Sequence, residues 1–168
     1  MLKIINDLSP FFEDCYREIS VREFARENGI APPTASKMLK YFASKDLLKM
    51  HEERSFLLFR TNRESKIMKD LSRIYWQYRL HKLVDYLESN LHSKSIVLFG
   101  SLSKLEVKKD SDIDLAVFAV TKEEIKLNKL EKKIGRKIQL FIFDSIDNVN
   151  KELRMNIIRG HLLRGIIM

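Results

Sequence analysis

The sequence predicts an α+β fold made of two modules, and three observations indicate it. A helix–turn–helix pattern followed by two short strand patterns comes first. A long stretch with helical spacing of apolar residues follows it. Two apolar runs then occur, one ending at Gly100 and the other continuing from Asp114. We therefore expect one domain over residues 1–64 and a second over residues 65–168, which includes the linking helix.

The composition is that of a globular protein: 45% of the 168 residues are hydrophobic, with only 5 Gly and 3 Pro. No apolar run approaches the ~20 residues that span a bilayer, and the opening segment with Pro10 does not resemble a signal peptide. We therefore expect no membrane partner. The single Cys15 excludes an internal disulfide, which suits a cytoplasmic protein, and we expect it to be a small core residue. The net charge of +8 favours polyanionic partners.

The N-terminal third begins with signals for two short helices. Ser20 and Glu23 have the spacing of a capping box, in which each side chain bonds the backbone of the other residue. Asn28-Gly29 supplies the left-handed residue of a sharp turn, and Pro32 opens a second helix. The apolar stripe expected on that helix consists of Ala35, Met38, Leu39 and Phe42.

Two short strands are expected after the second helix, Leu47–Met50 and Ser55–Arg60, around a turn at His51–Arg54. This order resembles a winged helix-turn-helix, a family in which the second helix enters the DNA major groove and the ribbon contacts the backbone. Residues 34–63 carry seven Lys/Arg and three Asp/Glu. The resemblance therefore implies double-stranded DNA as a partner. The DNA-binding residues it suggests are Thr34, Ser36, Lys37, Lys40 and Arg54.

Winged helices also serve as protein-interaction or dimerisation modules, so a homodimer stays open. After a boundary at Thr61–Glu64, helical spacing continues through Asn90 and predicts one long linking helix. We expect Trp76 to belong to a packed face and not to a base-stacking surface. The apolar residues of the linking helix are Ile67, Leu71, Ile74, Tyr75, Tyr78, Leu83, Val84, Leu87 and Leu91.

The segment Ile96–Asp114 carries the chemistry. An apolar strand ends at Gly100-Ser101, ten residues follow, and Asp112-Ile113-Asp114 opens the next strand. Residues two apart on a strand share a face, so both carboxylates point the same way. Two neighbouring carboxylates on a buried face are stable mainly when a divalent cation lies between them.

These residues resemble the signature of minimal nucleotidyltransferases of the DNA polymerase β superfamily. The resemblance implies that a hydroxyl attacks the α-phosphate of a nucleoside triphosphate, expected to be ATP, and that pyrophosphate leaves. It implies nucleotide binding by Gly100 and Ser101, where glycine lets the backbone approach the phosphates. Asp112 and Asp114 would be the catalytic residues and the ligands of Mg²⁺, of which the family uses two ions.

The third carboxylate of the family is missing. The resemblance places it on a neighbouring strand, where this sequence has Gln139. An amide brings no charge and cannot accept the proton of the attacking hydroxyl, and general-base help is typically worth ~10²–10⁴ in rate. Asp144 is expected on the opposite face of its strand, and Asp110 and Glu106 lie in the connecting segment. Leu105 stands where such enzymes commonly have glycine.

The rest of the C-terminal module predicts a small mixed sheet with helices. Gly135 is expected to end a Lys-rich helix whose lysines are solvated. The four histidines are scattered without ligand spacing, so no zinc site is assigned. The expected elements are strand Ser95–Phe99, a short helix from Ser103, strand Ile113–Val120, helix Lys122–Ile134, strand Lys137–Phe143 and helix Asn148–Leu163.

Functions of different classes follow from these patterns. The first is a Mg²⁺-dependent nucleotidyltransferase tethered to a DNA-binding module. Some relatives of this size transfer AMP onto a HEPN-type toxin, so the resemblance also implies an antitoxin-like role with such a partner. The alternative, motivated by Gln139, is a DNA-binding transcriptional regulator whose nucleotidyltransferase-like domain has weak or no turnover. A third is a scaffold that uses both modules only for protein contacts.

Overall fold

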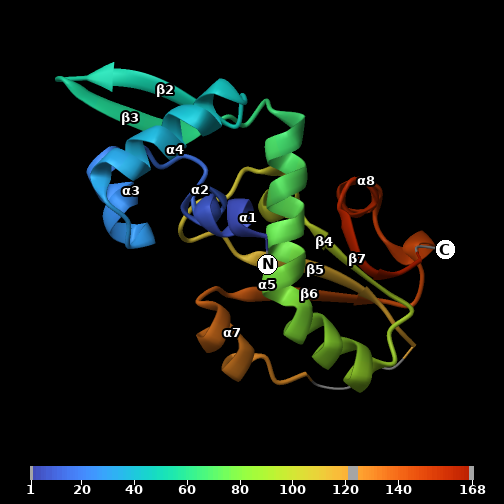
Figure 1. Ribbon diagram of the computed structural model, residues 1–168. Coiled ribbons are helices and arrows are strands. Elements are labelled where there is room, and N and C mark those ends of the chain that lie inside the picture. Colours follow the sequence, from blue (N-terminus) through green and yellow to red (C-terminus); the bar gives the residue numbers. More distant parts are fainter. Residues whose placement is uncertain (1, 121–124, 167–168) are drawn as a thin grey trace. The chain divides into compact units, whose positions relative to one another are not determined.

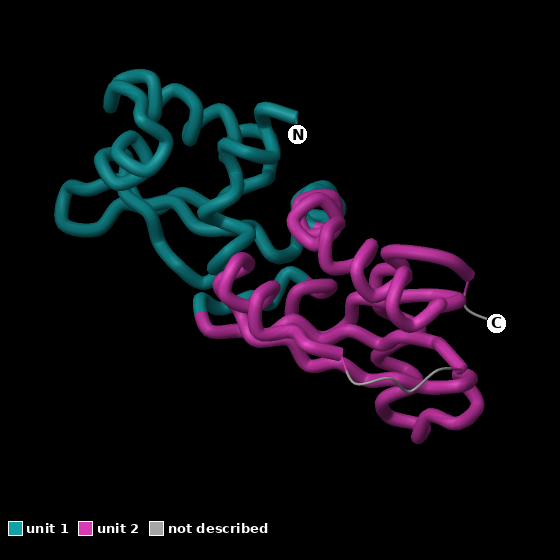
Figure 2. Tube along the Cα trace, turned by 90° about the horizontal axis from the view of Figure 1, so that it is seen from below, with its two compact units in different colours: residues 1–72, 105–109 teal, residues 73–104, 110–168 magenta. Residues whose placement is uncertain are grey.

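The computed structural model describes residues 2–120 and 125–166, and it confirms the predicted α+β class (Figure 1). The chain divides into two compact units, which Figure 2 colours separately. The first consists of residues 1–72 with 105–109, and the second of residues 73–104 with 110–168. No helix in the described part of the chain is long and apolar enough to cross a membrane.

The first unit begins with two short helices, α1 (Lys3–Asp7) and α2 (Ser9–Glu13). The capping box is confirmed at the start of α3 (Val21–Asn28). There Ser20 Oγ accepts the Glu23 N–H at 3.3 Å, and Glu23 Oε2 accepts the Ser20 N–H at 3.4 Å. Gly29 ends α3 in the left-handed conformation, with φ +62°. In α4 (Pro32–Ser44) the predicted stripe is buried at Ala35, Leu39 and Phe42, with Met38 half-buried.

A three-stranded antiparallel sheet completes the first unit, in the order β1 (Ile19–Ser20), β3 (Phe56–Thr61), β2 (Leu48–Glu53). The predicted turn at His51–Arg54 is wrong, because the first three of these residues continue in β2. The turn is instead Arg54-Ser55, with φ values of +47° and +66°. Positive φ at both turn positions matches the strand twist of a two-residue hairpin. The sequence lacks the glycine or asparagine that usually signals such a turn.

The long helix α5 (Lys66–Leu91) is confirmed, and most of its predicted apolar residues are buried, among them Tyr75, Leu83 and Leu87. Trp76 is buried, as expected. Ile67, Ile74 and Tyr78 are exposed, contrary to the prediction, and the packed face also includes Met68 and Leu80, which were not predicted. Apolar residues occur on several sides of this helix, so spacing alone does not identify the packed stripe. The helix begins in the first unit and continues in the second from Arg73.

The second unit contains a mixed four-stranded sheet, whose strands are β4 (Ser95–Phe99), β5 (Ile113–Phe118), β6 (Ile138–Phe143) and β7 (His161–Gly165). The strand order is β6-β5-β4-β7, and the β5–β6 pair is parallel while the other two pairs are antiparallel.

The predicted helix Asn148–Leu163 is wrong at both ends. A 3₁₀ turn occupies Ile146–Asn148, α8 is limited to Lys151–Ile158, and the last residues form β7. The reason lies at Gly160, where a Cβ would lie 2.6 Å from the carbonyl oxygen of Leu98. The backbone therefore passes directly over β4 at this glycine and joins the sheet as a strand.

Each face of this sheet has its own cover. One face packs Val97 and Phe118 against Val149 and Ile157 of the α8 region. The part of α5 that belongs to the second unit runs from the start of β6 to β7 (Figure 1). Near the start of β6, the Arg136 guanidinium lies 5.3 Å from the centre of the Trp76 ring of α5. In β7, Arg164 donates a hydrogen bond to Asp85 of α5 at 2.7 Å. The sheet is thus packed by other elements and carries the residues at its strand ends.

The remaining elements differ from prediction mainly at their ends. The short helix α6 (Gly100–Lys104) starts at the glycine and not at Ser103, and β5 ends two residues before Val120. Within the described residues the Lys-rich helix is α7 (Asn128–Ile134), and residues 121–124 of the predicted Lys122–Ile134 helix lie outside the described residues. Gly135 ends α7 with φ +82°, as predicted.

Candidate nucleotide and metal site

The end of β4 meets the start of β5 at the predicted motif. In the antiparallel register Phe99 lies opposite Asp114, so Gly100 follows directly beside this acid. Gly100 has φ +69°, and a Cβ on it would lie 2.1 Å from Asp114 Oδ2. Glycine is required here for two independent reasons, the left-handed backbone and the absence of space. The glycine–serine bend and the second acid are therefore brought together.

Asp112 and Asp114 influence each other electrostatically. Burial raises the pKa of Asp114 above its ordinary value, and the negative charge of Asp112 raises it further. Both side chains are half-buried. A divalent cation between them would relieve the lost hydration and the repulsion, and two carboxylates with water and phosphate oxygens suffice for Mg²⁺. The donor set thus fits the cation that the sequence predicts.

Gln139 reaches this pair. In the parallel register of β5 and β6 it lies opposite Asp114, and its Nε2 donates a hydrogen bond to Asp112 Oδ2 at 2.7 Å. A carboxylate at this position would add a third negative charge, whereas the amide donor stabilises the existing acid without an ion. The amide also has no lone pair basic enough to take a proton from an attacking hydroxyl.

Arg136 lies beside this site, although no sequence pattern pointed to it. It is 8% exposed, and its Nη1 donates to the carbonyl oxygen of Ser111 at 2.7 Å. The Ile113 N–H adds a 2.9 Å bond to the Lys137 carbonyl. These bonds fix the backbone on both sides of Asp112, so Arg136 is a positioning residue. A lone arginine after a helix carries no signal of such a role.

The other predicted carboxylates are not part of this arrangement. Asp144 follows β6 and is exposed, as are Asp110 and Glu106. Glu106 lies in the segment 105–109, which groups with the first unit. Ser101 occupies the second position of α6 and is half-buried.

The backbone conformation at Leu105 shows why related enzymes commonly have glycine at this position. It adopts φ +60°, a conformation that glycine takes without strain, yet its side chain is 1% exposed. Its carbonyl oxygen accepts a hydrogen bond from Cys15 Sγ at 3.2 Å, and the Val107 carbonyl accepts the Cys15 N–H at 2.9 Å. The segment between the two halves of the motif is therefore held by Cys15. Burial raises the pKa of this thiol to about 11, which agrees with a core residue and not a reactive one.

The predicted DNA-binding residues all lie in the first unit. Thr34, Lys37 and Lys40 are exposed on α4, Ser36 is half-buried there, and Arg54 is exposed in the β2–β3 turn.

Residues 81–165 match the family described as "Polymerase beta, Nucleotidyltransferase". A solved structure described as a toxin-antitoxin with AMP-PNP is similar over 51% of this chain and 73% of its own, with 25% identity and a TM-score of 0.43. A mutant of the toxin-antitoxin MntA-HpeT is similar over 51% and 72%, with 22% identity and a TM-score of 0.41. No curated protein matches the sequence.

Proposed function

This chain belongs to the polymerase beta nucleotidyltransferase family, whose match covers just over half of its 168 residues, and we propose that it transfers a nucleoside monophosphate from a Mg²⁺-bound triphosphate to a hydroxyl. The observation that carries the proposal is the contact of Gly100 with Asp114 beside Asp112. It supports a phosphate-binding bend next to a cation-binding pair. The remaining feature to explain is how a proton leaves the acceptor.

Each residue has a role that follows from its position. Gly100 lets the triphosphate approach the backbone, and the Ser101 hydroxyl donates to a phosphate oxygen. Asp112 and Asp114 would hold Mg²⁺, which neutralises charge on the phosphates and orients them. In the transfer, the acceptor oxygen forms a bond to the α-phosphorus, the bond to the pyrophosphate oxygen breaks, and the hydroxyl proton passes to solvent.

The hydrogen bond of Gln139 to Asp112 favours a second candidate, a nucleotide-binding regulator that does not turn over. The amide holds Asp112 in place without a cation but supplies no base, which costs typically ~10²–10⁴ in rate. Both candidates share Mg²⁺-nucleotide binding and differ in product formation. The full chain should therefore be assayed by calorimetry with Mg²⁺-ATP and, separately, for pyrophosphate release.

We expect binding that Asp112→Ala abolishes, with Asp144→Asn as the control that removes a carboxylate at the other end of β6 without effect. Pyrophosphate release above the Asp112→Ala background identifies an enzyme. Binding without release identifies the regulator. An absence of Mg²⁺-dependent binding in the unaltered chain refutes both.

We further propose that the first unit binds double-stranded DNA through α4 and the β2–β3 hairpin, as its sequence resemblance implies. Exposed Lys37, Lys40 and Arg54 support the proposal. Binding of this kind weakens steeply with salt, because phosphate contacts release counterions. The affinity for DNA that includes the protein's own promoter region should fall with salt and on Lys37→Ala. Lys66→Ala, at the start of α5, is the control for loss of one positive charge.

For the nucleotidyl transfer itself, the acceptor that we propose first is a hydroxyl on a HEPN-type protein.

A further inference from the structure

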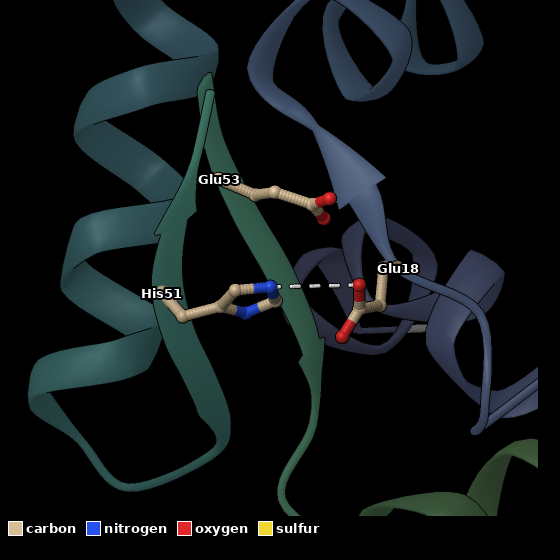
Figure 3. Close-up of side chains that lie close together, drawn as sticks. All are labelled: Glu18, His51 and Glu53. Carbon is tan, nitrogen blue, oxygen red and sulfur yellow. Dashed lines mark ion pairs between the residues drawn. The ribbon is translucent and has the colours of Figure 1, made fainter. Parts of the chain in front are cut away.

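We propose a second metal site, for a transition metal ion such as Zn²⁺, formed by Glu18, His51 and Glu53 in the first unit. One ligand atom from each of these residues lies within 4.8 Å of the other two. Figure 3 shows the imidazole and the two carboxylates turned toward a common region. This site is independent of the Asp112–Asp114 pair and of the proposed nucleotide chemistry.

The β-sheet register of the first unit explains why these residues meet. His51 and Glu53 are two apart on β2, so their side chains leave the same face of the sheet. Glu18 directly precedes β1, where Ile19 pairs with Phe59 and Ser20 pairs with Leu58. His51 also pairs with Leu58, on the other side of β3. The ligands therefore come from β2 and from the residue before β1, at the two edges of the sheet, and converge over the central strand.

The distances suit direct coordination. His51 Nε2 lies 3.5 Å from Glu18 Oε2. Metal–ligand bonds of about 2.0–2.2 Å place two ligands of a tetrahedral ion about 3.3–3.6 Å apart. The Glu18 and His51 side chains are 36% and 41% exposed, so small rotations can bring the remaining ligand atoms to bonding distance.

The ligand chemistry selects the class of ion. One imidazole nitrogen and two carboxylates suit Zn²⁺, Co²⁺ or Ni²⁺, whereas Mg²⁺ and Ca²⁺ prefer oxygen ligands alone. The neighbouring hollow is also lined by Lys49 and Arg60, but Lys49 Nζ is bonded to Glu64 at 2.8 Å. Three protein ligands leave one coordination position open to solvent. A bound ion would join the two edge strands of the sheet and stabilise the hairpin.

The test is titration of the full chain with Zn²⁺ and Co²⁺ in millimolar Mg²⁺, which competes for sites with oxygen ligands only. We expect one equivalent to bind, and His51→Ala and Glu53→Gln each to weaken binding at least about tenfold, or 1.4 kcal/mol. Co²⁺ should show the intense visible absorption of tetrahedral coordination. Because Zn²⁺ binds the folded state, it should also raise the unfolding temperature.

Glu52→Gln is the matched control, since it removes the same charge from the neighbouring residue of β2, whose side chain leaves the opposite face. It should bind Zn²⁺ like the unaltered chain. Absence of saturable binding, or binding unchanged by His51→Ala, overturns the site. Equal weakening by Glu52→Gln also overturns it, because the effect would then be one of net charge. Glu53→Gln preserves the shape of an exposed side chain, so it tests the site even where His51→Ala lowers stability.

Discussion

The acid pair of the second unit and the Glu18–His51–Glu53 cluster of the first differ in how they are assembled. The pair consists of Asp112, just before β5, and Asp114 within it; both are half-buried, and Asp114 lies directly beside Gly100. The cluster combines two exposed residues of the edge strand β2 with exposed Glu18, which precedes β1 and is far from them in sequence. Close packing holds the residues of the first site in place, whereas the strand register of an exposed sheet brings those of the second together. Substitutions should therefore affect them very differently.

The largest expected effect on nucleotide binding is that of Gly100→Ala. The new Cβ would overlap Asp114 Oδ2, and alanine at φ +69° adds about 1–2 kcal/mol of backbone strain. We expect loss of Mg²⁺-ATP binding by calorimetry and a decrease of roughly 2–4 kcal/mol in the free energy of unfolding. Gly135→Ala is the matched control, because Gly135 has φ +82° but no atom within 4 Å of its added Cβ. Gly135→Ala should lower the free energy of unfolding only by the backbone strain and should leave nucleotide binding intact. Similar nucleotide affinities for both variants would refute the close fit of Gly100 and Asp114.

The second prediction concerns Gln139→Asp, which should increase activity where Gly100→Ala abolishes nucleotide binding. The change removes the hydrogen bond to Asp112 and adds a carboxylate beside the pair. Without metal the variant should unfold more easily, since three acids repel one another. With Mg²⁺ the variant should regain its stability, because the cation offsets the repulsion. It should also release pyrophosphate about 10²-fold faster than the unaltered chain, because a general base is restored.

Steady-state pyrophosphate release measures this prediction, and Gln139→Leu distinguishes a new base from mere loss of the amide. Equal rates for the aspartate and leucine variants would show that residue 139 does not serve as a base. The Zn²⁺ affinity of the first unit should be the same in all three proteins.

The third prediction concerns Leu105, whose left-handed backbone is combined with burial. Leu105→Ala should lower the free energy of unfolding by about 2–5 kcal/mol through the cavity it leaves. Leu105→Gly loses the same contacts but relieves about 1–2 kcal/mol of strain. The glycine variant should therefore be the more stable of the two in urea unfolding, the reverse of their order in a helix. A less stable glycine variant would contradict the left-handed conformation.

The sequence predicted those parts of the protein that adjacent residues determine. The strand ending at Gly100, the D-x-D pair, the Ser20–Glu23 capping box and the length of α5 all depend on local spacing. The Arg54-Ser55 turn and β7 could not be predicted in the same way, since the sheet and the contact of Gly160 with β4 impose them. The bonds of Gln139 to Asp112 and of Arg136 to Ser111 join segments about 25 residues apart. Which side chains meet across such a distance depends on strand register.

The smallest expected effect is on the pH dependence of stability at Asp114. Its pKa is raised in the folded state by burial and by Asp112, so the folded protein holds this proton more tightly than the unfolded chain does. The resulting stability is present below the unfolded pKa of about 3.9 and is lost as the pH rises through the folded value. At neutral pH the ionised group therefore destabilises the fold.

Asp114→Asn should accordingly raise the unfolding temperature at pH 7 without Mg²⁺, and the gain should disappear as the pH falls below about 4. Differential scanning calorimetry across this range measures it. Glu53→Gln is the comparison in the exposed cluster, and without metal it should change stability by less than about 0.5 kcal/mol. A cation that binds the pair would offset the cost of ionising Asp114 in its buried position beside Asp112. A destabilising Asp114→Asn at neutral pH would mean that the carboxylate is already compensated by the protein, and the reason for a cation at this pair would then be lost.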